Sequence, residues 1–168
     1  MSTTPRWLNA EERRAWLAYV DFSTLLADYL NRQLRRDSGI THTDYALLAF
    51  LSSAPDQALG MSELACKLRI TRSRLTHAVN RLAEAGFVDR RESPVDGRSQ
   101  LAVLTDEGRA LLEQAAPGHV TAVRRAIFDA LTPEQVAQFT EIGEAISTAL
   151  LRVDATDSDP AVLPWRRR

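Results

Sequence analysis

The sequence predicts a mainly α-helical protein with one small β-hairpin. Residues 61–85 contain two stretches with helical apolar spacing separated by a short turn, and Gly86 follows the second stretch. Two short runs of β-type residues come next, joined by a turn that contains Pro, Asp, Gly and Arg. Long helical patterns lie at both ends of the chain. The expected architecture is therefore a helix-turn-helix with a hairpin wing, plus a helical region built from both chain ends.

The N-terminal pattern predicts one long helix. Asn9, followed three residues later by Glu12, resembles a capping box, and Ser38-Gly39 marks the end of the helix. Apolar residues recur at close to helical spacing between Trp16 and Leu34. About 27 residues at a rise of about 1.5 Å each give a length of roughly 40 Å. Because so long a helix rarely packs only within a monomer, we expect part of it to contact a second copy.

The middle of the chain predicts three shorter helices. The first begins near Thr41, with Asp44 three residues on, and is followed by a loop over residues 52–60. The next begins at Gly60 or Ser62. Thr71 caps the third, whose apolar positions have the i, i+3, i+4, i+7 spacing of a buried face: Leu75, Ala78, Val79 and Leu82.

The hairpin and two further helices complete the pattern. Phe87 to Glu92 and Gln100 to Thr105 are the expected strands of the wing. Thr105 also caps a fifth helix, in which Pro117-Gly118 favours a kink over a full break. Thr132-Pro133-Glu134-Gln135 is a second capping box and begins a sixth helix. The tail from Asp154 is polar and aperiodic.

These elements suggest a division of the chain by role. Residues 41–105 form the winged helix-turn-helix domain, residues 9–40 and 106–152 form the helical dimerisation region, and residues 1–8 and 153–168 are flexible terminal arms. The apolar stripes of the end helices are too wide for a small winged domain to cover. A two-fold dimer would place two equivalent helices about 34–36 Å apart, which is one turn of DNA.

Composition and charge narrow the function. The net charge is −1, but residues 67–98 hold eight Lys or Arg and four Asp or Glu, a net of +4. The rest of the chain holds thirteen Lys or Arg and eighteen Asp or Glu, a net charge of −5. Positive charge therefore gathers where the helix-turn-helix lies, as a DNA-binding surface requires.

Several function classes are not expected. The one cysteine excludes an internal disulfide and a Cys-based zinc site. No phosphate-binding Gly-rich loop, nucleophile elbow or metal-ligand cluster is present, so we expect no enzyme activity, no cofactor and no metal. The sequence has neither an apolar run of about 18 residues nor a signal peptide, which predicts a cytoplasmic protein without membrane contact.

The polar face of the expected fourth helix is the candidate contact with the DNA major groove. Arginine can donate to guanine O6 and N7, and asparagine can pair with adenine N6 and N7. Alone, such a face would more often be merely solvated, but a helix-turn-helix context favours DNA contact. The candidate residues are Thr71, Arg72, Ser73, Arg74, Thr76, His77, Asn80 and Arg81.

The hairpin supplies a second set of candidates: Arg91, Asp96, Gly97 and Arg98. Arg98 at the tip should enter the minor groove, where a narrow A·T tract concentrates negative potential. Asp96 is expected to hold Arg98 by an ion pair, and Gly97 to shape the turn. Arg90 and Arg91 are adjacent on a strand and point to opposite faces, so at most one of them faces DNA well.

Several of these features together resemble the MarR family of winged-helix regulators. The resemblance runs from about Ala15 to Leu151. It rests on a set of short motifs at near-family spacings: Leu64-Ala65, Thr71, Leu82 with Gly86 (one residue longer than usual), Asp96-Gly97-Arg98, and Leu104-Thr105 with Gly108. The resemblance implies a triangular homodimer that binds double-stranded DNA at palindromic operators. It also implies, in many members, release of DNA by a small phenolic or aromatic compound or by oxidation of a cysteine.

This resemblance points to two candidate responsive sites. Trp16, Tyr19, Phe22, His42 and Tyr45 are candidates for the lining of an effector pocket, although core packing or a dimer interface explains each one individually. Cys66 is the candidate redox switch. Redox-sensing members carry theirs near the start of the first helix, so a partly buried, inert Cys66 is the alternative.

A winged-helix protein-interaction module that never binds DNA is the remaining alternative. Such modules usually lose the cationic helix face and the wing arginine, and this chain keeps both. The sequence therefore favours a dimeric, ligand-responsive repressor.

Overall fold

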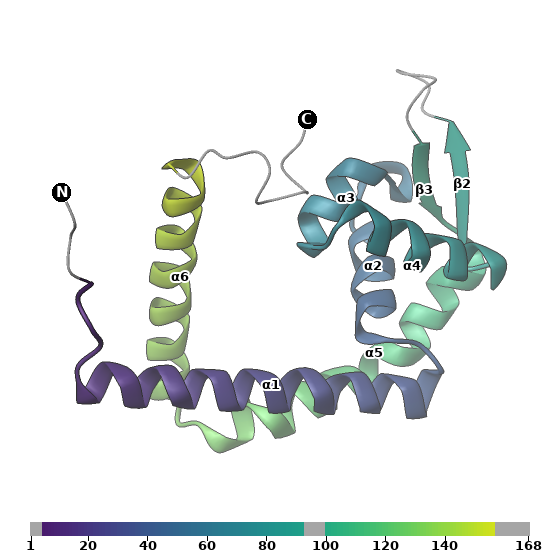
Figure 1. Cartoon of the computed structure of the whole chain (residues 1–168). Helices are drawn as coiled ribbons and strands as arrows, with labels where there is room; N and C mark the ends of the chain where they lie inside the picture. The colour runs from purple at the N-terminus through teal and green to yellow at the C-terminus, as the bar shows by residue number, and fades with distance from the viewer. Residues whose placement is uncertain (1–4, 93–99, 157–168) are drawn as a thin grey trace.

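The computed structural model describes residues 5–92 and 100–156. It confirms the mainly helical fold with a small antiparallel sheet. Figure 1 shows α2, α3, α4 and the sheet gathered at one end of the long helix α1, and α6 near its other end. The bounds of the elements are α1 Ala10–Ser38, α2 His42–Ser52, η1 Pro55–Gln57, β1 Ala58–Gly60, α3 Met61–Leu68, α4 Arg72–Glu84, β2 Val88–Glu92, β3 Gln100–Leu104, α5 Asp106–Ala126, η2 Phe128–Ala130 and α6 Pro133–Thr156.

Capping residues define the helix starts as predicted. The Asn9 side chain accepts a hydrogen bond from the Glu12 N–H, and the Glu12 carboxylate accepts one from the Asn9 N–H, which completes a capping box at the start of α1. Thr41 and Asp44 form the same arrangement at the start of α2. Gly39, at a φ of 70°, ends α1 in the left-handed conformation that glycine adopts most readily.

The sheet contains one strand that the sequence did not predict. Residues 52–60 were expected to form a loop, but the structure places a 3₁₀ turn at Pro55–Gln57 and a strand at Ala58–Gly60. The strand order is β1-β3-β2, and both pairs are antiparallel. Three residues are too few to show an alternating pattern, and the partner strand lies about 40 residues away, so local sequence carried no signal for β1.

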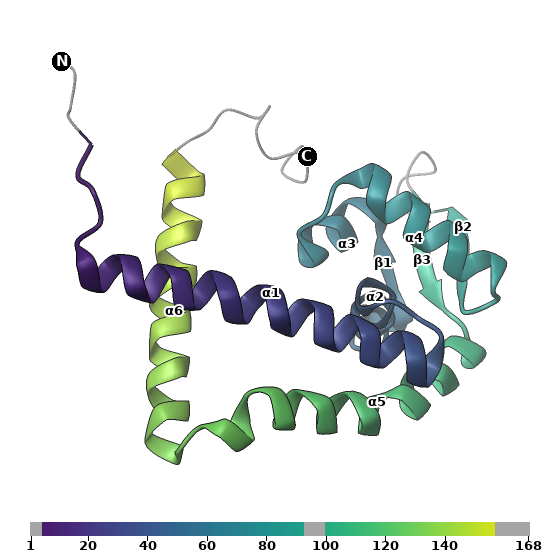
Figure 2. The same ribbon diagram turned by 60° about the horizontal axis from the view of Figure 1, so that its bottom comes forward.

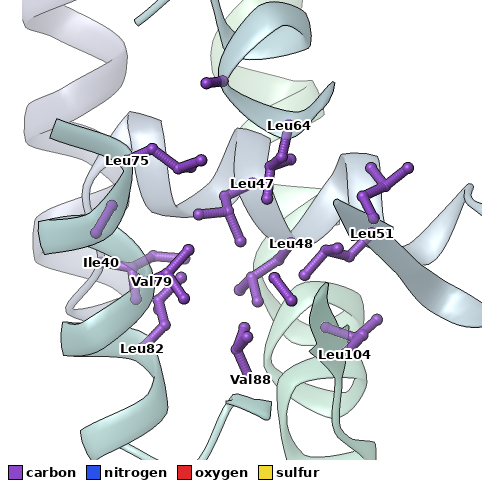
Figure 3. Packing of buried hydrophobic residues seen from close by; sticks show 14 of the residues in the cluster. Ile40, Leu47, Leu48, Leu51, Leu64, Leu75, Val79, Leu82, Val88 and Leu104 are labelled. Carbon is purple, nitrogen blue, oxygen red and sulfur yellow. The ribbon is translucent and has the colours of Figure 1, made fainter. Parts of the chain in front are cut away.

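Leucine and valine side chains from α2, α3, α4 and the sheet form one core. Leu47, Leu48 and Leu51 present one face of α2 to its centre, and Leu75, Val79 and Leu82 meet them from α4 (Figure 3). The buried positions of α4 are those that the helical spacing predicted. This packing leaves the opposite face of α4 toward solvent.

Helix α5 leads from the winged domain along α1, and its last residues lie beside the middle of α1, near Phe22 and Leu25. It continues through Pro117 without the full break that the sequence disfavoured, and it ends at Ala126. Its start is tightly packed: a Cβ added at Gly108 would lie 2.1 Å from the Phe87 carbonyl oxygen. Only glycine fits at that position without movement of the backbone.

Helix α6 carries an exposed apolar stripe. Figures 1 and 2 both show α6 crossing near α1 and standing apart from the winged domain. Phe139, Ile142, Ile146 and Leu150 follow helical spacing along one face, and the three aliphatic side chains are 53–58% exposed. The helix extends through Thr156, four residues past the end expected for the dimerisation region.

Candidate nucleic-acid interface

The candidate surface is the outer face of α4 and the adjoining strands of the wing. Thr71 caps α4, and its side-chain oxygen accepts a hydrogen bond from the Arg74 N–H at 3.3 Å. Of the eight predicted residues on this helix, five are exposed and three, Thr71, Thr76 and Asn80, are half-buried. The structure therefore presents one polar face with a high density of arginine, as the sequence predicted.

The residues nearest the start of α4 differ in how freely they can reach a ligand. Arg72 donates to the Ser62 hydroxyl of α3 at 2.8 Å, and the Thr76 hydroxyl donates to the Arg72 carbonyl oxygen at 2.9 Å. Within the described part of the chain, Arg74 and His77 make no side-chain hydrogen bond or ion pair. Arg74 therefore has its whole guanidinium available to phosphate or a base edge, whereas Arg72 and Arg81 each use one N–H within the protein.

Arg81 has a structural partner that the sequence did not reveal. Its Nη2 donates to Asp44 Oδ1 at 2.5 Å, and the Asp44 side chain is only 3% exposed. The other carboxylate oxygen, Oδ2, accepts from the Thr41 N–H at 2.9 Å and the Thr41 hydroxyl at 2.7 Å. Asp44 thus caps α2 and ties it to α4 through Arg81. This bond directs the Arg81 guanidinium toward α2, and its other N–H groups remain toward solvent.

Arg90 is a further candidate, whereas the sequence analysis assigned Arg91 of the same pair to the DNA-binding wing. Its Nη1 donates to Asn80 Oδ1 at 2.7 Å, and its Nε donates to Gln100 Oε1 at 2.9 Å. Strand alternation predicted that Arg90 and Arg91 face opposite ways, but it could not say which of them faces α4. The structure places Arg90 on that side, while Arg91 contacts Asp89 at 3.3 Å.

The base of the wing is anchored to α5. The Thr105 hydroxyl donates to the Gly86 carbonyl oxygen at 2.8 Å and accepts from the Gly108 N–H at 3.0 Å. One threonine therefore holds the end of β3, the turn after α4 and the first turn of α5 together. The predicted wing-tip residues Asp96, Gly97 and Arg98 lie outside the described residues.

The five predicted effector-pocket residues form two groups rather than one. Trp16, Tyr19 and Phe22 make successive ring contacts along α1, with centroids 5.7 and 5.6 Å apart, and Phe22 also contacts Phe139 of α6 at 6.4 Å. His42 and Tyr45 instead contact His119 of α5, at 5.6 and 4.4 Å. The single lining proposed from the sequence does not match this arrangement, because the tertiary fold separates the two helix segments.

A hollow of about 450 Å³ lies between α1 and the end of α5. Of the five predicted residues, Phe22 alone lines it. The other residues that line the hollow are mostly apolar and include one cation, Arg125. They are Leu25, Leu26, Tyr29, Arg125, Ala126 and Ile127. Periodicity indicated that the α1 residues share a face but not that α5 packs beside them.

The contacts around His119 shift the acidity of three groups. Burial lowers the pKa of His42, and burial together with the nearby His42 lowers the pKa of His119. Burial raises the pKa of Tyr45. His119 Nδ1 lies 3.3 Å from Oε1 of the buried Gln33 on α1, so α1, α2 and α5 meet at this cluster.

Cys66 lies on α3 and is exposed, whereas partial burial was the expected alternative to a redox role. No three His, Cys, Asp or Glu side chains gather as a metal site within residues 5–92 and 100–156. In the same ranges, no helix combines the length and apolarity needed to cross a membrane.

Comparison with known proteins is consistent with this arrangement. A family model described as the MarR family matches residues 38–99. The HTH-type transcriptional repressor YetL of Bacillus subtilis is 33% identical over 104 residues, which span 62% of this chain and 62% of YetL.

Solved structures extend the match over the full chain. Sco3205, a MarR family transcriptional regulator from Streptomyces coelicolor solved in complex with DNA, is 48% identical, with 99% of this chain and 100% of that chain covered and a TM-score of 0.86. AbsC, a MarR family transcriptional regulator from the same organism, is 34% identical, with 87% and 98% covered and a TM-score of 0.81. These relatives are transcriptional regulators rather than enzymes. The chain described here belongs to the MarR family of transcriptional regulators.

Proposed function

We propose that this regulator is a cytoplasmic, homodimeric repressor that binds a palindromic operator in double-stranded DNA through α4 and the wing. The observation that carries the proposal is the exposed arginine-rich face of α4. The opposite face of α4 packs into the buried core. The Asp44–Arg81 and Asn80–Arg90 contacts also help to hold the helix in place. A helix fixed in this way can enter the major groove without a further ordering cost. The DNA complex of the 48% identical Sco3205 supports the same role.

The apolar stripe of α6 supports the homodimer. Phe139, Ile142, Ile146 and Leu150 expose a continuous apolar surface that a soluble monomer rarely leaves uncovered. On α1, the half-exposed Phe22 contacts Phe139 of this stripe, with ring centroids 6.4 Å apart. A second copy of the same helices would cover both surfaces about a two-fold axis.

The hollow between α1 and α5 supports control by a small phenolic or aromatic effector. Its apolar walls suit a ring, and Arg125 and the Tyr29 hydroxyl offer polar contacts. A compound that binds here would lie between α1 and α5, the helix that leads to the wing.

Selection of bound duplexes from a random DNA pool tests the proposal most directly. A two-fold symmetric site is the expected result. If the dimer makes six to ten phosphate contacts, its affinity should fall by about 10³ to 10⁵ between 50 and 200 mM salt. Weak binding that hardly responds to salt would instead favour a protein-interaction module.

A substitution of Arg74 distinguishes a base contact from a phosphate contact. Arg74→Ala should relax the base preference by about 1–3 kcal/mol at one symmetric pair of positions, because its free guanidinium can contact guanine. Uniform weakening across operator variants would make Arg74 a phosphate contact.

Cys66→Ser tests the redox alternative. This substitution should leave the effect of peroxide on operator binding unchanged; loss of a peroxide response in this variant would favour the redox alternative.

A further inference from the structure

Arg90 of β2 joins the wing to the recognition helix α4. Its Nε and Nη2 both donate to Oε1 of Gln100 on β3, and its Nη1 donates to Oδ1 of Asn80 at 2.7 Å. Arg90 is paired with Ala102 in the sheet, so Gln100, two residues away on β3, lies on the same face. Three N–H groups of one guanidinium therefore hold three elements in a fixed relation.

The chemistry of arginine settles which way the Asn80 amide is turned. A guanidinium has five N–H donors and no acceptor, so the Asn80 atom that faces it must be the carbonyl oxygen. The NH₂ group of the amide is then turned away from Arg90. In the absence of Arg90, the same amide could rotate and present either its oxygen or its nitrogen to a ligand.

This orientation changes what Asn80 can recognise. Asparagine pairs with adenine by donating to N7 while its oxygen accepts from N6. The Asn80 oxygen is already bonded to a cation, and a base amino group brought there would meet the positive charge of Arg90. The outward NH₂ group is suited instead to acceptors, of which guanine presents two, N7 and O6, side by side in the major groove.

We propose that Arg90 is a specificity-determining positioning residue: it fixes Asn80 as a hydrogen-bond donor and so favours guanine over adenine at one symmetric pair of operator positions. The inference rests on the proposed function, in which the outer face of α4 contacts the operator. Arg90 acts here through Asn80 and not through a base contact of its own. Its two remaining N–H donors are free to bind a phosphate.

The test compares guanine and adenine at each position of the operator selected by the wild-type protein, with binding measured by fluorescence anisotropy at fixed salt. The wild type should prefer guanine at one symmetric pair of positions by about tenfold. Arg90→Ala should shift that preference toward adenine, because the freed amide can rotate. Asn80→Ala should abolish the preference, and Arg90→Ala in the Asn80→Ala background should change it no further.

Arg91→Ala is the matched control. Arg91 is the next residue on the same strand, carries the same charge and is exposed, but it contacts Asp89 rather than α4. Its loss should weaken binding to all operator variants by a similar factor and leave the base preference intact. Because Arg90, Arg91 and Asn80 lie outside the buried core, all variants should still fold, which circular dichroism checks.

Three results would overturn the inference. Equal weakening at every base by Arg90→Ala would make Arg90 only a phosphate contact. The same shift in base preference with and without Asn80 would mean that Arg90 contacts the base directly. An unchanged preference in Asn80→Ala would remove Asn80 from recognition. Failure of the wild type to bind any duplex is a separate result, since it would refute the proposed function itself and with it any role of Arg90 in specificity.

Discussion

At the residue scale, Asp44 shows how one buried carboxylate can organise the DNA-binding domain. Its two oxygens accept from the Thr41 backbone, the Thr41 hydroxyl and the Arg81 guanidinium. The sequence predicted the first part of this arrangement, because a capping box is a local pattern. It could not predict the bond to Arg81, which lies 37 residues away and depends on how α2 and α4 pack.

Replacing Asp44 with alanine should lower the free energy of unfolding by about 2–3 kcal/mol, since it removes a helix cap and a buried set of hydrogen bonds. Urea unfolding followed by circular dichroism measures the effect. Asp89→Ala is the control, because the Asp89–Arg91 pair is exposed on both sides and should contribute less than about 1 kcal/mol. Equal effects of the two substitutions would argue against the role given to Asp44.

Gly108 offers a second test at this scale. A methyl group there would overlap the Phe87 carbonyl, so Gly108→Ala should cost about 1–3 kcal/mol of stability or more. Gly118→Ala in the same helix should instead stabilise by about 0.5–1 kcal/mol, because a Cβ at that position meets its neighbours at ordinary contact distance. Thermal unfolding of the two variants should therefore shift in opposite directions.

At the scale of elements, the junction of α1, α2 and α5 was the least predictable part of the molecule. The sequence identified His42 and Tyr45 as candidates, but it gave no reason to place His119 of α5 against them. Helical periodicity shows which residues of one helix share a face and not which other helix covers that face. The same limit explains why β1 and the orientation of Arg90 were missed.

The histidines at this junction predict a pH dependence of stability. Their pKa values are lowered in the folded protein, so the unfolded chain takes up protons first as the pH falls. The free energy of unfolding should therefore decrease as the pH drops below the usual histidine pKa of about 6.5 and until it reaches the lowered values.

His119→Gln should make this decrease shallower, because glutamine does not titrate. Chemical unfolding at several pH values between 7.5 and 5 measures the slope. His77→Gln is the control: His77 is on the exposed face of α4, away from the junction, and its replacement should leave the slope as it is in the wild type. A wild-type slope in His119→Gln would contradict the assignment of the effect to the junction.

At the scale of the whole molecule, the uncovered stripe of α6 is the feature that points to assembly. The sequence indicated it through apolar spacing, and the structure adds that α6 stands away from the winged domain, where its own chain does not cover it (Figure 2). In the proposed homodimer a second copy would bury this stripe, and the same two-fold pairing would suit a palindromic site.

Ile146→Glu should therefore weaken the dimer by at least about tenfold, because a carboxylate would be buried without a partner in the stripe. Sedimentation analysis over a range of protein concentrations measures the dissociation constant. Glu144→Ala, on the opposite face of α6, should leave it nearly unchanged. A monomeric wild type, or a dimer that tolerates the glutamate, would show that the stripe has another role.

Because α5 runs as one continuous helix from the anchored base of the wing to the middle of α1, its length is constrained by rotation as well as by reach. Each residue added or removed would turn the hairpin by about 100° around the axis of α5 and shift it by about 1.5 Å. In the proposed dimer, a change of one residue would thus turn the two hairpins so that they no longer face the same side of the DNA. Variation in length is far easier to accommodate in the loops than within α5.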